Sequence, residues 1–69
     1  MIGDKILKDR KGYRFYVKKY GVQNLYVCRI GPDWRMIYTL VFDGAGVAVI
    51  CLEVMDHKKY DQLFGYKTT

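Results

Sequence analysis

The chain has 69 residues, of which 51% are hydrophobic and 28% are charged, with a single proline. This length allows one small domain that buries only about 60% of its unfolded surface, and the composition excludes a disordered or collagen-like chain. The longest apolar run, 44–52, is far shorter than the ~20 residues of a membrane span, and the N-terminus lacks the apolar core of a signal peptide. We therefore expect one cytoplasmic domain over residues 1–69, without a membrane segment.

The charge is strongly positive and unevenly distributed. Twelve Lys and Arg residues against seven Asp and Glu residues give a formal net charge of +5, and seven of the basic residues fall within 5–19. Such a field favours a nucleic acid, an acidic protein or a membrane surface as partner, and it fits a merely soluble basic domain equally well. Cys28, Cys51 and the single histidine do not have the spacing of a zinc site, so we predict neither a metal nor a cofactor.

The first expected element lies within a basic N-terminal segment, residues 1–20. Tyr13, Val17 and Tyr20 are spaced i, i+4 and i+7, and Gly21 follows directly. This pattern predicts a short helix over 14–20 with a glycine C-cap. The same stretch is rich in Tyr and Val, so a strand is the alternative.

Three strands are expected next, in the segment 21–56. The runs 23–30, 34–42 and 47–55 are rich in β-branched and aromatic residues, and the turn signals Gly31–Asp33 and Asp43–Gly46 separate them. Short connections of this kind predict an antiparallel meander.

The chain is expected to end in a short helix and tail, residues 57–69. Asp56 is a suitable N-cap, and residues 57–64 allow two helical turns that Gly65 closes. The fold class is therefore α+β: a three-stranded antiparallel β-meander with a short C-terminal helix and a short basic N-terminal segment.

Period-two geometry predicts which side chains share a face of this sheet. With the two turns as hairpin centres, Arg35 lies opposite both Arg29 and Met55, and Asp33 lies opposite His57. The even-numbered strand residues then form one apolar face that needs a cover, most simply a second copy of the chain. Cys28 and Cys51 fall on opposite faces in this register, so we expect no disulfide between them.

The odd-numbered face combines apolar residues with polar and charged ones. Its polar members are Arg29, Arg35, Thr39, Glu53 and His57. Two arginines on neighbouring strands repel each other, and such a pair is usually matched by an anion. Either Glu53 supplies that anion in a solvated salt-bridge cluster, or a phosphate group does.

The same residues carry a resemblance to a known family. The run 24–31 (Asn-Leu-Tyr-Val-Cys-Arg-Ile-Gly), the run 34–38 (Trp-Arg-Met-Ile-Tyr) and the ending 56–66 (Asp-His-Lys-Lys-Tyr-Asp-Gln-Leu-Phe-Gly-Tyr) resemble the RelE/ParE toxin superfamily of toxin–antitoxin systems. The match covers about residues 21–66. The strand and two helices that precede these strands in the family have no counterpart in residues 1–20.

The resemblance implies a function and a set of site residues. RelE-like members are metal-independent endoribonucleases (mRNA interferases) that cut messenger RNA, commonly on the ribosome, and a cognate antitoxin neutralises them. By resemblance, Arg35 would stabilise the scissile phosphate, His57 would act as general base or acid, and Tyr60 is the third catalytic candidate. The residues expected to bind substrate are Arg29, Lys58, Lys59 and Tyr66, the last of which is also a rival to Tyr60.

Two other functions stay open on the sequence alone. A truncated toxin-like module would bind RNA or an antitoxin without cutting, and the aromatic residues would offer surfaces for stacking bases. A ParE-like chain would instead inhibit gyrase. His57 and Tyr60 favour the RNA-cutting branch, whereas the absence of the family's first strand and helices favours the non-catalytic module.

Overall fold

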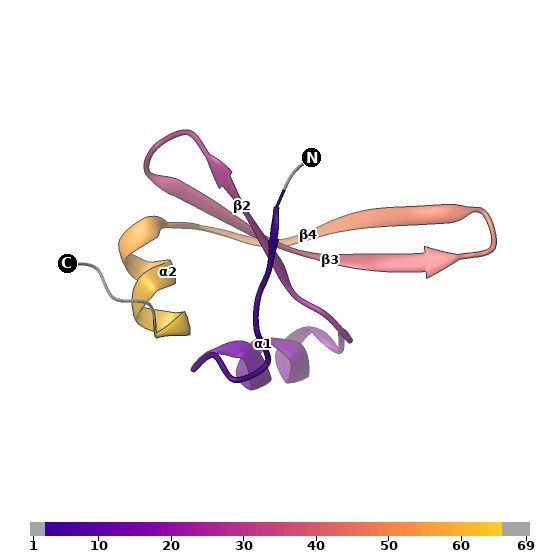
Figure 1. The fold of residues 1–69 in the computed structure, drawn as a ribbon, viewed down its shortest axis with the longest axis horizontal. Helices are drawn as coiled ribbons and strands as arrows, with labels where there is room; N and C mark the ends of the chain where they lie inside the picture. The colour runs from indigo at the N-terminus through magenta and orange to yellow at the C-terminus, as the bar shows by residue number, and fades with distance from the viewer. Residues whose placement is uncertain (1–2, 66–69) are drawn as a thin grey trace.

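The computed structural model describes residues 3–65 as a four-stranded antiparallel sheet with two helices (Figure 1). In chain order the elements are β1 (Asp4–Lys5), α1 (Tyr13–Tyr20), β2 (Tyr26–Ile30), β3 (Trp34–Asp43), β4 (Gly46–Asp56) and α2 (His57–Phe64). The strands lie side by side in sequence order, so the α+β class and the meander of β2, β3 and β4 are confirmed. The sequence analysis missed β1, because a strand of two residues shows no periodicity.

Both helices have the capping residues that the sequence predicts. The segment after Gly12 is helical rather than extended, and α1 stops where Gly21 takes a left-handed conformation (φ 65°) and donates its N–H to the Val17 carbonyl. At the start of α2, the Asp56 carboxylate accepts a 2.8 Å hydrogen bond from the Lys59 N–H. This capping bond satisfies one of the backbone donors that the first turn of a helix leaves free.

The core lies between one face of the sheet and the two helices. Tyr16 of α1 stacks on Phe64 of α2, with ring centroids 5.5 Å apart, and both pack over the sheet residues Leu25 and Ile37. The full buried cluster consists of Ile6, Tyr13, Tyr16, Leu25, Ile37, Met55, Tyr60 and Phe64. The odd-numbered face of β2 and β3 is therefore the covered one. Four aromatic helix side chains pack against the apolar odd-numbered residues, whereas the cover expected for the even-numbered face, a second copy of the chain, stays a prediction.

An irregularity in β4 also changes the predicted faces. Ile37 pairs with Glu53 but Tyr38 pairs with Cys51, so Leu52 is an extra residue in β4. Beyond this bulge the alternation of β4 is inverted, as an inserted residue requires. Ala48 and Ile50 therefore share the face of the odd-numbered β3 residues, and Val47, Val49 and Cys51 share the other face, opposite to the prediction.

The bulge places Cys51 on the same face of the sheet as Cys28. The prediction that the two cysteines lie on opposite faces is therefore wrong. Both are free cysteines. Cys28 pairs with Met36 and Cys51 pairs with Tyr38, so the two cysteines lie on β2 and β4 with β3 between them. Two interstrand spacings, about 10 Å in total, exceed the reach of a disulfide.

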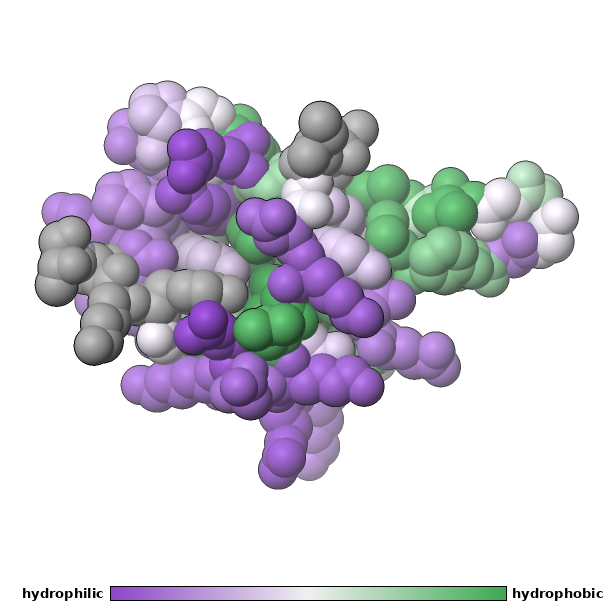
Figure 2. Space-filling view, viewed as in Figure 1, coloured by the Kyte–Doolittle hydropathy of each residue, from purple (hydrophilic) through white to green (hydrophobic). Residues whose placement is uncertain are grey.

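The far half of the β3–β4 hairpin projects from the body of the protein (Figure 1). We call residues 40–51 the arm. Its strands are paired only with each other, from Leu40 opposite Val49 to Asp43 opposite Gly46, because β2 ends its pairing with β3 at Tyr38. Figure 2 shows the arm as the apolar end of a largely hydrophilic surface. No helix within residues 3–65 is long and apolar enough to cross a membrane.

Candidate functional site

Two arginines stand directly opposite each other at the end of the sheet remote from the arm. Arg29 of β2 pairs with Arg35 of β3, and Arg35 in turn pairs with Met55 of β4, as predicted. Directly opposed residues in an antiparallel pair have Cα atoms only about 4.5–5.5 Å apart. The Arg35 guanidinium donates a 3.1 Å hydrogen bond to the Trp34 carbonyl, and Arg35 is half-buried while Arg29 is exposed.

No carboxylate within residues 3–65 lies within ion-pair distance of either arginine. The anion that the sequence offered for them, Glu53, is engaged elsewhere. Its two oxygens accept hydrogen bonds from the phenols of Tyr20 (2.8 Å) and Tyr16 (3.4 Å). The salt-bridge cluster of Arg29, Arg35 and Glu53 is therefore not formed, and no acidic side chain among residues 3–65 compensates the two positive charges of the arginine pair.

His57 begins α2, two residues after Met55, the residue of β4 that pairs with Arg35. Its backbone N–H donates a 2.8 Å hydrogen bond to the Asp33 carbonyl, which ties the start of α2 to the turn between β2 and β3. The imidazole Nδ1 lies 3.8 Å from Asp61 Oδ2, one helical turn further on. A carboxylate facing one ring nitrogen can orient the ring so that the other nitrogen points elsewhere. The sequence analysis did not single out Asp61, although its i, i+4 spacing from the histidine was a usable signal.

The other predicted site residues differ in their exposure to solvent. Lys58 and Lys59 are exposed in the first turn of α2, and Lys59 Nζ lies 4.0 Å from the Glu53 carboxylate. Tyr60, in contrast, is only 6% exposed and packs its ring 4.9 Å from that of Phe64. Tyr66 lies outside the described residues.

A cluster of aromatic and charged groups joins α1 to β4. Tyr16 and Tyr20 are stacked with ring centroids 5.9 Å apart, and Lys19 Nζ lies 5.2 Å from the Tyr20 ring centroid. Burial, together with the neighbouring Glu53 carboxylate, raises the pKa of Tyr16 to about 12. The hydrogen bond to Glu53 is the main cause that raises the pKa of Tyr20. Both phenols therefore remain protonated at neutral pH and act as donors that fix the carboxylate.

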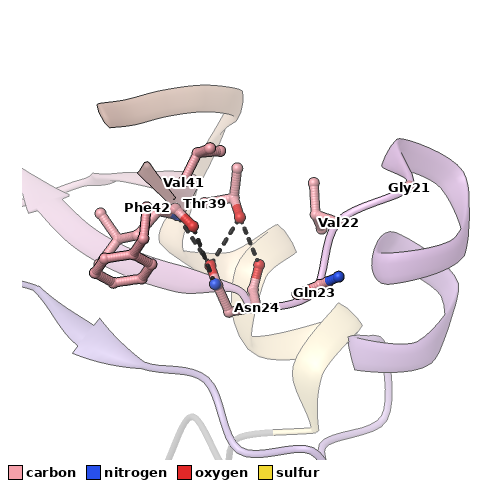
Figure 3. Close-up of a pocket in the computed structure, with 8 residues that line it drawn as sticks. Gly21, Val22, Gln23, Asn24, Thr39, Val41 and Phe42 are labelled. Carbon is pink, nitrogen blue, oxygen red and sulfur yellow. Dashed lines mark hydrogen bonds between the residues drawn. The ribbon is translucent and has the colours of Figure 1, made fainter. Parts of the chain in front are cut away.

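A pocket of about 370 Å³ opens where the loop after α1 meets the base of the arm (Figure 3). The Asn24 side chain bridges this junction. Its Oδ1 accepts from the Leu40 N–H (2.9 Å) and from the Thr39 hydroxyl (2.7 Å), and its Nδ2 donates to the Leu40 carbonyl (3.1 Å). The lining residues include no titratable side chain, so the pocket offers no acid–base chemistry: Gly21, Val22, Gln23, Asn24, Thr39, Leu40, Val41 and Phe42.

The chemistry of the described residues is therefore concentrated around the arginine pair and His57. No group of three or more His, Cys, Asp or Glu side chains that could hold a metal ion occurs within the part of the chain that the structure describes. No family model matches the chain, and neither a curated protein nor a solved structure matches it significantly. The function must accordingly be inferred from the geometry of the site.

Proposed function

We propose that this protein is a RelE-like endoribonuclease toxin that binds RNA through the arginine pair and cleaves it without a metal. The observation that carries the proposal is the direct opposition of Arg29 and Arg35 with no carboxylate nearby among the described residues. Two forked guanidiniums without a carboxylate partner among the described residues suit a phosphate, which accepts several charge-assisted hydrogen bonds from such groups. The net charge of +5 favours the approach of a polyanion.

The reaction that these groups support is an internal transfer at the phosphate. His57 Nε2, the ring nitrogen that Asp61 does not face, takes the proton of the ribose 2′-hydroxyl. The 2′-oxygen then attacks the adjacent phosphorus, the bond from phosphorus to the 5′-oxygen breaks, and the departing oxygen takes a proton from water. The products are a 2′,3′-cyclic phosphate and a 5′-hydroxyl. Arg35, assisted by Arg29, stabilises the negative charge that develops on the phosphate oxygens.

The buried position of Tyr60 suits a positioning role rather than contact with substrate. Its ring lies beside that of Phe64, one turn further along α2, and both belong to the buried core, so they hold α2, which carries His57 and Asp61, against the sheet. Lys58, exposed in the same turn, would contact the RNA backbone outside the scissile phosphate. Messenger RNA, on or off the ribosome, is the proposed substrate, and the neutralising partner would be an acidic antitoxin.

The test is cleavage of messenger RNA, with and without ribosomes, by the full chain. We expect Arg35→Ala to lower the rate by about 10²–10³-fold, as the loss of one charge-stabilising donor does, and His57→Gln by about 10²–10⁴-fold. Arg14→Ala, which removes an exposed arginine from α1, is the matched control and should cleave at nearly the wild-type rate. A 2′-deoxy nucleotide at the cleavage site should block the reaction.

Two results would contradict this proposal in different ways. RNA binding by wild type that Arg35→Ala weakens, without cleavage under any condition, would indicate the non-catalytic module. Equal cleavage by wild type and His57→Gln would remove the histidine from the mechanism.

A further inference from the structure

The arm gathers exposed apolar side chains at one end of the protein. Every residue from Val41 to Cys51 is exposed. Five of its large apolar side chains are between 43% and 65% exposed and lie on both faces of the ribbon: Val41, Phe42, Val47, Val49 and Ile50. At about 150–200 Å² for each side chain when fully exposed, they leave roughly 450 Å² of apolar surface on the arm. An isolated two-stranded ribbon is only marginally stable in water, so this arm needs a partner.

The outer edge of β4 is open to such a partner. β4 is the last strand of the sheet, and none of the other described strands pairs with that edge. The strand Gly46–Asp56 contains no lysine, arginine or proline, which are the residues that usually protect an edge strand from further pairing. Its outward N–H and C=O groups therefore form a template for another antiparallel strand.

The distribution of charge leaves the arm free to pair with the arm of a second copy of the chain. Residues 40–51 carry a single charged side chain, Asp43, so the positive charge of the protein lies entirely outside the arm. Two such bodies repel each other when close together, but antiparallel pairing of two β4 strands through their arms places the bodies at opposite ends. This pairing also brings the tip of each arm beside the body of the other copy, where part of the apolar face is covered.

We propose that two copies of the protein form a dimer in which the β4 arms pair antiparallel across a two-fold axis near Val49. The sheets of the two copies then join into one continuous sheet of eight strands. Edge pairing leaves the two faces of the ribbon open, so each copy buries its strand edge and only part of the roughly 450 Å² of apolar surface. This is less than the ~800 Å² per partner of standard complexes and predicts a weak, concentration-dependent dimer. This inference does not depend on the proposed RNA cleavage.

The first test is the molar mass of the full chain in reducing buffer, measured by sedimentation over a range of concentrations. We expect a monomer–dimer equilibrium that Val49→Lys weakens more than tenfold, because two like charges would face each other across the axis. Leu7→Lys adds the same charge at an exposed apolar residue outside the arm and should leave the equilibrium unchanged. Added salt should strengthen the wild-type dimer, since it screens the repulsion between the basic bodies.

The second test fixes the geometry independently of the effect of Val49→Lys on folding. In a background of Cys28→Ser and Cys51→Ser, Val49→Cys should form a disulfide-linked dimer under a mild oxidant, because directly opposed β residues lie within the reach of a disulfide. Leu7→Cys in the same background should not. A wild-type chain that stays monomeric at every concentration, or a dimer that Val49→Cys fails to cross-link, would overturn the proposal.

Discussion

The side chain of Asn24 should be a major contributor to stability, because it takes the place of a missing strand residue. β2 begins at Tyr26, which pairs with Tyr38 of β3, and no residue before it is paired with β3. Continuing that register would bring residue 24 opposite Leu40. The Asn24 amide makes this connection with its side chain, accepting from the Leu40 N–H and donating to the Leu40 carbonyl, as a paired strand residue would do through its backbone (Figure 3).

Replacing Asn24 with alanine removes three side-chain hydrogen bonds, the third being from the Thr39 hydroxyl at 2.7 Å. A net contribution of about 1 kcal/mol for each gives up to ~3 kcal/mol. Thr39 keeps its 3.0 Å bond to the Asn24 carbonyl, and water can reach the half-buried Leu40 groups, so we expect a loss near 2 kcal/mol. That is a large fraction of the roughly 3.5–10 kcal/mol expected for a domain of 69 residues.

The assay is urea unfolding followed by the fluorescence of Trp34, the only tryptophan, at one fixed protein concentration. With a slope of about 1–2 kcal/mol per molar urea for so small a domain, the midpoint should fall by roughly 1–2 M. Gln23→Ala is the matched control, since Gln23 is the exposed neighbouring amide. If Asn24→Ala unfolded within ~0.5 kcal/mol of Gln23→Ala, the bridging amide would not stabilise the base of the arm.

Two further substitutions test the packing of α1. A Cβ at Gly12 would lie 2.6 Å from the Leu63 carbonyl oxygen, so Gly12→Ala should lower the free energy of unfolding by about 1–3 kcal/mol, whereas Gly44→Ala, in open space, should have little effect by the same urea assay. The pKa of Tyr16, raised from 10.0 to about 12, means that the folded state holds this proton more tightly than the unfolded state. Stability should therefore be complete below pH 10 and fall as the pH rises toward 12, and Tyr16→Phe should flatten that decline in alkaline unfolding curves. An alkaline decline that is the same in both proteins would assign it to other groups.

The sequence predicted the elements better than it predicted the faces. Glycines after both helices, the Asp56 cap and the two turns gave the order and class of the elements, because such signals are local. The bulge at Leu52 has no comparable signal, since an apolar residue inside an apolar strand fits either register. The position of the bulge is tied to the packing of Ile37 and Met55 under the helices, and that packing depends on residues far apart in the chain.

The candidate site was predictable only in part, for a related reason. The opposition of Arg29 and Arg35 follows from the turn between their strands, so the two-residue alternation of a β-strand was sufficient to predict it. The sequence could not predict that Glu53 accepts hydrogen bonds from Tyr16 and Tyr20 and makes no ion pair with the arginines. These bonds depend on the position of α1 over the sheet, which is a tertiary property. The burial of Tyr60 was hidden for the same reason, since an amphipathic turn does not reveal which of its aromatic residues faces the core.

The arm and the arginine pair should be functionally independent, because they lie at opposite ends of β3. Seven residues separate Arg35 from Phe42, which corresponds to about 23 Å along a strand and exceeds the ~8 Å Debye length at physiological salt. Val49→Lys should therefore leave the rate of RNA cleavage per chain unchanged while it dissociates the dimer. Arg35→Ala should leave the dimerisation constant within about twofold while it lowers cleavage by about 10²–10³-fold. Measuring both properties on both variants gives four results from two assays. A Val49→Lys chain that dissociates and also loses cleavage would show that the active site needs the second copy, and it would refute the separation of the two ends of the sheet.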